Sequence, residues 1–171
     1  VGDEVFISET YGPGSTLLHV APGEQRVVWL DGKKRDKSMQ THWNTAVHHD
    51  GYLYGSSGRH TANAELRCID WKTGEVQWTE PGLTRSSLLY VDGHFVCLSE
   101  DGVLRLLKAT PKGYTLVDSA LLIDKNARVN PLTGRPAQLL KSPCWAAPIL
   151  SHGLLYVRGE DRLVCLELIP Q

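Results

Sequence analysis

Three segments of the chain repeat one pattern: an apolar stretch, a turn that contains glycine, and a second apolar stretch. They are HWNTAVHHDGYLYGSSG (42–58), RSSLLYVDGHFVCLSEDG (85–102) and CWAAPILSHGLLYVRGED (144–161), and GDEVFIS (2–8) matches the second half of the unit. Each turn glycine can take the positive φ that a tight hairpin demands. The repeat therefore predicts a chain built from β-hairpins.

Each hairpin is followed by further short strands, which bring a complete repeat to four. The third strands are LRCIDW (66–71), GVLRLLKA (102–109) and RLVCLEL (162–168), and the fourth are RVVWL (26–30), GEVQWTE (74–80) and YTLVDSALL (114–122). Successive turn glycines, from Gly2 through Gly51 and Gly93 to Gly153, are 49, 42 and 60 residues apart. Such a period with four strands is typical of β-propeller blades. We predict an all-β fold of 14 strands.

The strand pattern divides the chain into four blades of a single partial β-propeller domain, residues 1–171. The blades are approximately 1–31, 42–80, 84–122 and 144–169, with an inserted loop at 123–143. The first blade lacks its innermost strand and the last lacks its outermost strand, which leaves about three and a half four-stranded antiparallel blades. We therefore expect the C-terminal part of a longer propeller. Its open edges should pair either with the remaining blades or with a second copy.

The charge balance argues against a nucleic-acid binder. The chain has 18 Lys and Arg residues against 19 Asp and Glu residues, a formal net charge of −1. A protein that neutralises phosphates needs a basic surplus. No apolar run reaches the roughly 18 residues that span a bilayer, so we also expect no transmembrane segment.

Cysteine spacing predicts free thiols. Cys68, Cys97, Cys144 and Cys165 are separated by 29, 47 and 21 residues, without a CxxC pair. A structural zinc site needs closer ligand spacing, and a disulfide needs Cα atoms within about 7 Å of each other. Cys68 and Cys165 occupy the same place in two similar segments, where a small buried strand residue is expected.

The segment LRCIDWKTGEVQW (66–78) resembles the tryptophan-docking repeat of PQQ-like β-propellers. The matching positions are Leu66, Ile69, Asp70, Thr73, Gly74 and Trp78. Thr73-Gly74 would turn the hairpin between the third and fourth strands, and Trp78 would pack against a neighbouring blade. HVAPGEQRVVW (19–29) is a looser copy. We assign structural roles to Asp70, Gly74 and Trp78.

The resemblance implies two kinds of function. This superfamily includes scaffold proteins, such as the outer-membrane assembly lipoprotein, and quinoprotein dehydrogenases, which use a Cys-Cys disulfide and a calcium beside the quinone. The chain has no adjacent cysteines. We therefore expect a non-catalytic scaffold without a cofactor, which presents a loop face to a protein or saccharide-like ligand. The alternative is part of a PQQ-dependent quinoprotein oxidoreductase, or its relict, with PQQ and calcium. The resemblance also implies a bacterial protein of the periplasm or one that is secreted.

One face of the predicted propeller gathers the candidate ligand-binding residues. They are His42, Trp43, Arg59, His60, Arg85 and Trp145. The two arginines could hold an anionic group by bidentate contacts, or each could pair with a neighbouring carboxylate. The two tryptophans could stack a ligand ring, or pack between blades.

Three other segments are open to a functional interpretation. His42 and His60 could converge, but two histidines without a third ligand do not make a metal site, and we predict none. His48-His49-Asp50 is expected to be a solvated hairpin turn on the opposite face. The connection 123–143 is either a lid or docking loop or a solvated insertion.

Overall fold

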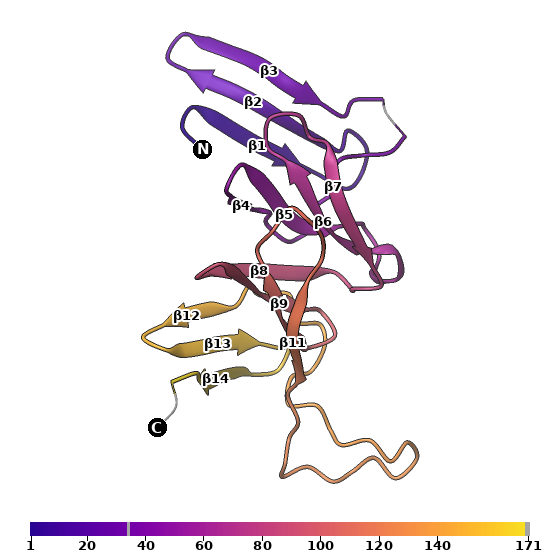
Figure 1. Cartoon of the computed structure of the whole chain (residues 1–171). Helices are drawn as coiled ribbons and strands as arrows, with labels where there is room; N and C mark the ends of the chain where they lie inside the picture. The colour runs from indigo at the N-terminus through magenta and orange to yellow at the C-terminus, as the bar shows by residue number, and fades with distance from the viewer. Residues whose placement is uncertain (34, 170–171) are drawn as a thin grey trace. The chain divides into compact units, whose positions relative to one another are not determined.

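The computed structural model describes residues 1–33 and 35–169, and within them it contains 14 strands and one short helical turn (Figure 1). The first two groups are β1 (Glu4–Ser8), β2 (Ser15–Ala21) and β3 (Glu24–Leu30), then β4 (Val47–His49), β5 (Tyr52–Ser57), β6 (Glu65–Asp70) and β7 (Val76–Pro81). The last two are β8 (Ser86–Val91), β9 (His94–Ser99), β10 (Val103–Lys108) and β11 (Leu116–Leu121), then β12 (Ile149–Ser151), β13 (Leu154–Arg158) and β14 (Leu163–Glu167).

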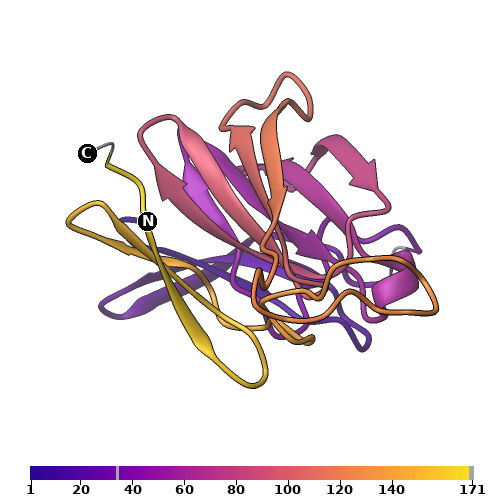
Figure 2. The same ribbon diagram turned by 90° about the horizontal axis from the view of Figure 1, so that it is seen from below.

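The strands form four separate antiparallel meanders. The sheet orders are β1-β2-β3, β4-β5-β6-β7, β8-β9-β10-β11 and β12-β13-β14. The predicted 14 strands, grouped as a partial, two full and a partial blade, are therefore confirmed in the described part of the chain. The one helical turn of the described residues is a 3₁₀ turn at Thr61–Asn63, which Figure 2 shows as a short coil. Among the described residues, no helix is long and apolar enough to cross a membrane.

The chain divides into two compact units. The first contains Val1–Arg85 together with Ala109–Thr115, and the second contains Ser86–Lys108 together with Leu116–Gln171. The sheets β1–β3 and β4–β7 lie in the first unit, and β8–β11 and β12–β14 in the second. Each unit thus has one full and one three-stranded sheet.

The repeated hairpin turns owe their shape to two consecutive residues with positive φ. The pairs are Asp50-Gly51 (φ 49° and 81°), Asp92-Gly93 (45° and 75°) and His152-Gly153 (50° and 77°). Positive φ at both central residues is the type I′ geometry, whose twist matches that of the flanking strands. Glycine takes the second position without steric cost, which explains why it recurs there in the sequence.

Aromatic side chains join the two sheets of the first unit. Trp29 from β3 donates its indole N–H to the carbonyl of Trp71, at 2.9 Å, and its ring lies 6.0 Å from that of Phe6. Trp71 in turn donates to the carboxylate of Glu4 at 2.6 Å, and Lys72 also binds that carboxylate. These two partners lower the pKa of Glu4. The contacts hold β1 and β3 against the β6–β7 turn.

The long connection between β11 and β12 is anchored at both ends and exposed in its middle. Leu140 and Cys144 are fully buried in the core of the second unit, together with Leu104 and Leu155. In contrast, Leu132 in the middle part of the connection is 94% exposed. The connection is therefore solvated only in part. Whether its exposed middle part acts as a lid or docking loop stays a prediction.

The burial predicted for Cys165 is wrong. Cys68 is buried, because β7 covers its strand with Trp78 directly opposite, whereas Cys165 is exposed. Cys165 lies on β14, which pairs only with β13 in the described part of the chain. The two cysteines are equivalent in the repeat, but a fourth strand covers only one of them. Self-association through such open edges stays a prediction.

The four cysteines are free in the structure, as the spacing predicts. Burial raises the pKa of Cys68 to about 12 and that of Cys97 to about 11, and it also raises the pKa of Cys144. Since the thiolate is the reactive form, these three thiols should be inert in the folded protein.

We expect a thiol reagent at pH 8 to modify Cys165 rapidly in the native chain, and all four cysteines after denaturation without reductant. Peptide mass spectrometry of the labelled protein measures both. A Cys165→Ser variant is the control and should show no rapid labelling. Fast native labelling of Cys68 would contradict the packing of β6 against β7.

Candidate functional site

Four polar side chains meet in the loops of the first unit, and we call them the His42 cluster: Tyr11, His42, Arg59 and Arg85. They come from four different connections, β1–β2, β3–β4, β5–β6 and β7–β8 respectively. The hydroxyl of Tyr11 lies 2.9 Å from Nε2 of His42, and Nη1 of Arg85 lies 2.9 Å from Nδ1 of the same ring. The structure therefore brings together three residues that the sequence analysis proposed, and it adds Tyr11.

The hydrogen bonds assign the tautomer of His42. A guanidinium group can only donate, so Nδ1 must accept from Arg85. The ring proton then sits on Nε2, which donates to the Tyr11 oxygen. Tyr11 is left with its own hydroxyl proton to donate outward. The cluster consequently presents donors to the solvent.

The two arginines are held by further contacts. The guanidinium carbon of Arg59 lies 4.7 Å from the centre of the Tyr11 ring, a cation–π arrangement. Nη1 of Arg85 also donates to the carbonyl of Arg59 at 3.1 Å. Arg59 is exposed and Arg85 is half-buried. Both guanidinium groups are thus held by contacts within the His42 cluster before any ligand binds.

A polar pocket of about 230 Å³ opens beside Arg59. It is lined by Thr10, Gln40, Ser57, Gly58, Arg59, His60, Asn63, Glu65 and Arg67. Arg67 forms an ion pair with Glu65 and donates to the carbonyls of Lys37 and Ser38. These contacts hold Arg67 in the wall of the pocket. Of the basic side chains that line the pocket, Arg59 and His60 are exposed.

His60 and Trp43 lie near the cluster but have other surroundings. The backbone N–H of His60 donates to the side chain of Asn63, and the N–H of Asn63 donates back to the carbonyl of His60, which starts the 3₁₀ turn. His60 is exposed at the pocket, whereas Trp43 is half-buried. His42 is bonded to Tyr11 and Arg85. Among the described residues, no group of three His, Cys, Asp or Glu side chains could hold a metal ion.

The prediction of a solvated hairpin turn at His48-His49-Asp50 is correct only for Asp50, because His48 and His49 lie in β4 and pair with β5. The ring of His48 packs edge-on against Trp71, with 4.8 Å between ring centres. Burial lowers the pKa of His48. The prediction overlooked this contact because Trp71 lies on the neighbouring β6–β7 turn.

The sixth proposed ligand residue, Trp145, belongs to the second unit. Its indole N–H donates to the carboxylate of Glu100 at 3.1 Å, and half of the side chain (50%) is exposed. Glu100 itself is buried. Glu100 is not among the residues predicted from the sequence to bind a ligand.

The three residues with proposed structural roles lie around the β6–β7 turn. Asp70 accepts hydrogen bonds at 2.8 Å from the backbone N–H groups of Lys72 and Thr73, which shapes the turn. Gly74 has a φ of +73° and lies against the ring of Trp29. Trp78 donates to the carbonyl of Thr110 at 3.0 Å. Each side chain or backbone position thus has a contact that suits its proposed role.

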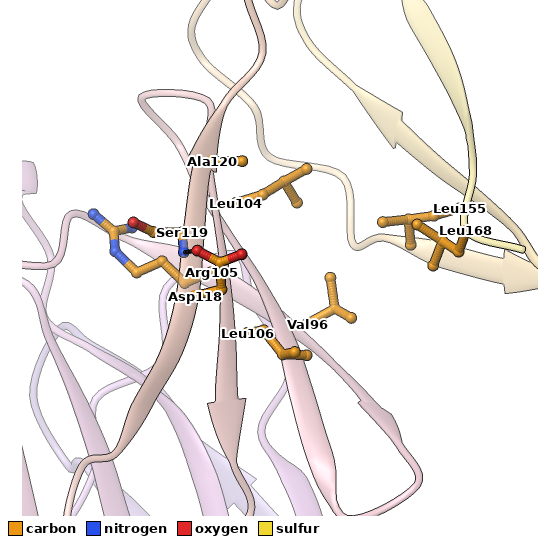
Figure 3. Close-up of a pocket in the computed structure, with 9 residues that line it drawn as sticks. All are labelled: Val96, Leu104, Arg105, Leu106, Asp118, Ser119, Ala120, Leu155 and Leu168. Carbon is orange, nitrogen blue, oxygen red and sulfur yellow. Dashed lines mark hydrogen bonds between the residues drawn. The ribbon is translucent and has the colours of Figure 1, made fainter. Parts of the chain in front are cut away.

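An apolar pocket of about 220 Å³ lies between the two sheets of the second unit (Figure 3). Val96, Leu104 and Leu106 project from one sheet toward Leu155 and Leu168 on the other side. The remaining lining residues are Arg105, Asp118, Ser119 and Ala120. None of the six candidate ligand residues lines this pocket.

The four antiparallel meanders and the similarity to the two solved structures below give this chain a partial β-propeller fold of the PQQ-like type. It is similar to BamB from Moraxella catarrhalis, with 14% identity, a TM-score of 0.63, and coverage of 96% of this chain and 40% of that one. It is also similar to a europium-containing methanol dehydrogenase, with 12% identity, a TM-score of 0.59, and coverage of 91% of this chain and 33% of that one. The chain thus spans well under half the length of either structure. Neither a protein-family model nor a curated protein sequence matches it.

The residues present do not fit the cofactor of the alternative prediction. The alternative, part of a quinoprotein oxidoreductase, implies PQQ held beside calcium, with a disulfide between adjacent cysteines. The four cysteines here lie far apart in sequence, and none is paired. The part of the chain that the structure describes also has no cluster of carboxylates suited to calcium. We assign no chemical step to a quinone in this chain.

Proposed function

We propose that this chain is a non-catalytic PQQ-like propeller module that binds a protein partner through the loop face around the His42 cluster. The observation that carries the proposal is the convergence of Tyr11, His42, Arg59 and Arg85 from four separate connections. Residues so far apart in sequence are brought together only by the folded scaffold. A site whose side chains are already bonded to one another loses little entropy on binding.

The chemistry of the cluster favours an acidic segment of the partner. Two guanidinium groups, the outward proton of Tyr11 and the nearby His60 supply donors and positive charge. Arginine binds carboxylates through two parallel hydrogen bonds. The adjacent polar pocket, about 230 Å³ in volume, has room for a side chain beside the charged contact. The geometry thus supports recognition of an aspartate- or glutamate-rich peptide.

A fluorescein-labelled octaglutamate peptide tests the proposal by fluorescence anisotropy. We expect binding that weakens as salt is raised, because exposed charges are screened, and an octalysine peptide should not bind. Arg59→Ala should reduce the affinity by about 10-fold, the loss of one charge-assisted contact. The same effect is expected for Arg85→Ala.

Arg26→Ala is the matched control, because Arg26 is an exposed arginine of the same unit that faces Glu24. It should leave the affinity unchanged. Arg85→Ala also removes bonds to His42 and Arg59, so the thermal midpoint of each variant must be compared with that of the parent chain. Equal affinities of the parent and of folded Arg59→Ala would overturn the proposal.

A further inference from the structure

Trp145 is an exposed aromatic side chain that is nevertheless held rigidly. Its indole N–H is bonded to the buried carboxylate of Glu100, at 3.1 Å. The N–H of the preceding Cys144 donates to the carbonyl of Glu100 at 2.9 Å, and the hydroxyl of Ser87 lies 3.4 Å from the carbonyl of Trp145. Both the ring and the backbone of this residue are therefore fixed, while half of its surface faces the solvent.

The exposed side of Trp145 lines a cleft of about 460 Å³ in the second unit. The cleft is lined by Pro143, Trp145, Ala146, Arg158, Gly159 and Glu160. Its volume lies within the range of about 300–1,000 Å³ that is usual for small-molecule sites.

The walls of the cleft are tied together by the backbone. The N–H of Glu160 donates to the carbonyl of Lys141 at 2.8 Å. A Cβ on Gly159 would lie 2.7 Å from the same carbonyl, so only glycine allows this close approach. Lys141 and Glu160 also form an ion pair at 2.6 Å. The cleft therefore exists before a ligand binds.

We propose that this cleft is a saccharide site, in which a pyranose ring stacks on Trp145 and its hydroxyls bind Arg158 and Glu160. The face of an indole carries negative charge density and attracts the weakly positive C–H groups of a sugar ring. The guanidinium of Arg158 donates and the carboxylate of Glu160 accepts. A hydroxyl can do both, so neighbouring hydroxyls of one sugar suit this mixed pair.

The charges around Trp145 favour a neutral ligand. The cleft is lined by one guanidinium group, that of Arg158, and one carboxylate, that of Glu160, which also forms the ion pair with Lys141. A cleft lined by one charge of each sign has no surplus of positive charge to attract a phosphate or an acidic peptide. This cleft is thus chemically distinct from the His42 cluster. The saccharide proposal does not depend on whether the octaglutamate peptide binds to the His42 cluster.

Nuclear magnetic resonance of ¹⁵N-labelled protein tests the inference with three probes: maltohexaose, cellohexaose and tri-N-acetylchitotriose. The indole N–H signal of Trp145 is assigned by its disappearance in Trp145→Phe. We expect at least one probe to shift this signal, with a dissociation constant of about 1 mM or lower, as is typical of a single stacked contact with few hydrogen bonds. No shift of this signal with any probe at about 10 mM, ten times that constant, overturns the proposal.

Variants test whether stacking on Trp145 is responsible for sugar binding. Trp145→Ala should weaken the affinity by at least about 10-fold, and Arg158→Ala should weaken it to a smaller extent. Arg162→Ala, an exposed arginine of the same unit bonded to Asp161, is the control and should bind normally. Arg59→Ala should also bind the sugar normally, which separates this site from the proposed peptide site. Unchanged sugar binding by a folded Trp145→Ala variant would overturn the assignment.

Discussion

Replacing Trp78 by alanine should lower the free energy of unfolding of the first unit by about 3 kcal/mol, the lower end of the range for removing a packed tryptophan. The lower end applies because the side chain is half-buried. Its ring lies between Tyr54, at 6.1 Å, and Tyr114, at 6.3 Å, and its N–H binds the carbonyl of Thr110. The substitution removes all three contacts and leaves a cavity.

Trp78→Phe separates packing from hydrogen bonding. Phenylalanine keeps most of the ring contact with Tyr54 and Tyr114 but cannot donate to Thr110, so a loss of about 1 kcal/mol is expected. Urea titration followed by near-ultraviolet circular dichroism measures both variants. If Trp78→Ala unfolds at the same urea concentration as the parent chain, the docking role of Trp78 is wrong.

The strand pattern could be predicted because its determinants are local. The Asp-Gly pairs at 50–51 and 92–93 specify type I′ hairpins through their own backbone preferences. The carboxylate of Asp70 reaches only two and three residues along the chain to form its turn. Interactions of such short range are visible in the sequence itself. They account for the correct number and grouping of the strands.

The candidate site could be predicted only in part, because its contacts are long-range. Tyr11 and His42 are 31 residues apart, and nothing around Tyr11 in the sequence indicates that they meet. Glu100 and Trp145 are 45 residues apart. The contact of Glu100 with Trp145 depends on how deeply the carboxylate of Glu100 is buried. Burial of that kind depends on packing, and the same limit explains the error for Cys165.

The glycine of the β6–β7 turn connects the local pattern to the packing between sheets. Trp29 is fixed from two sides: its N–H binds the carbonyl of Trp71, and its ring packs on Phe6. The remaining face of the ring lies directly over Gly74. The glycine is thus needed twice, for the backbone conformation of the turn and for the approach of the indole.

Gly74→Ala should therefore lower the free energy of unfolding by about 2–4 kcal/mol, as the sum of a positive-φ penalty of about 1 kcal/mol and an overpacking term of 1–3 kcal/mol. The new Cβ would lie 2.8–2.9 Å from three ring carbons of Trp29. Gly51→Ala is the matched control, since Gly51 has a φ of +81° but nothing within 4 Å of the added carbon. That variant should show the backbone penalty alone.

A double-mutant cycle identifies the source of the difference. In a Trp29→Ala background the steric conflict is gone, so Gly74→Ala should cost only as much as Gly51→Ala, about 1 kcal/mol. The two substitutions would then be non-additive by the overpacking term. Equal losses for Gly74→Ala and Gly51→Ala in the parent chain would show that Trp29 does not rest on Gly74. In that case the packing of β3 against the β6–β7 turn, on which the first unit depends, would have to be rejected.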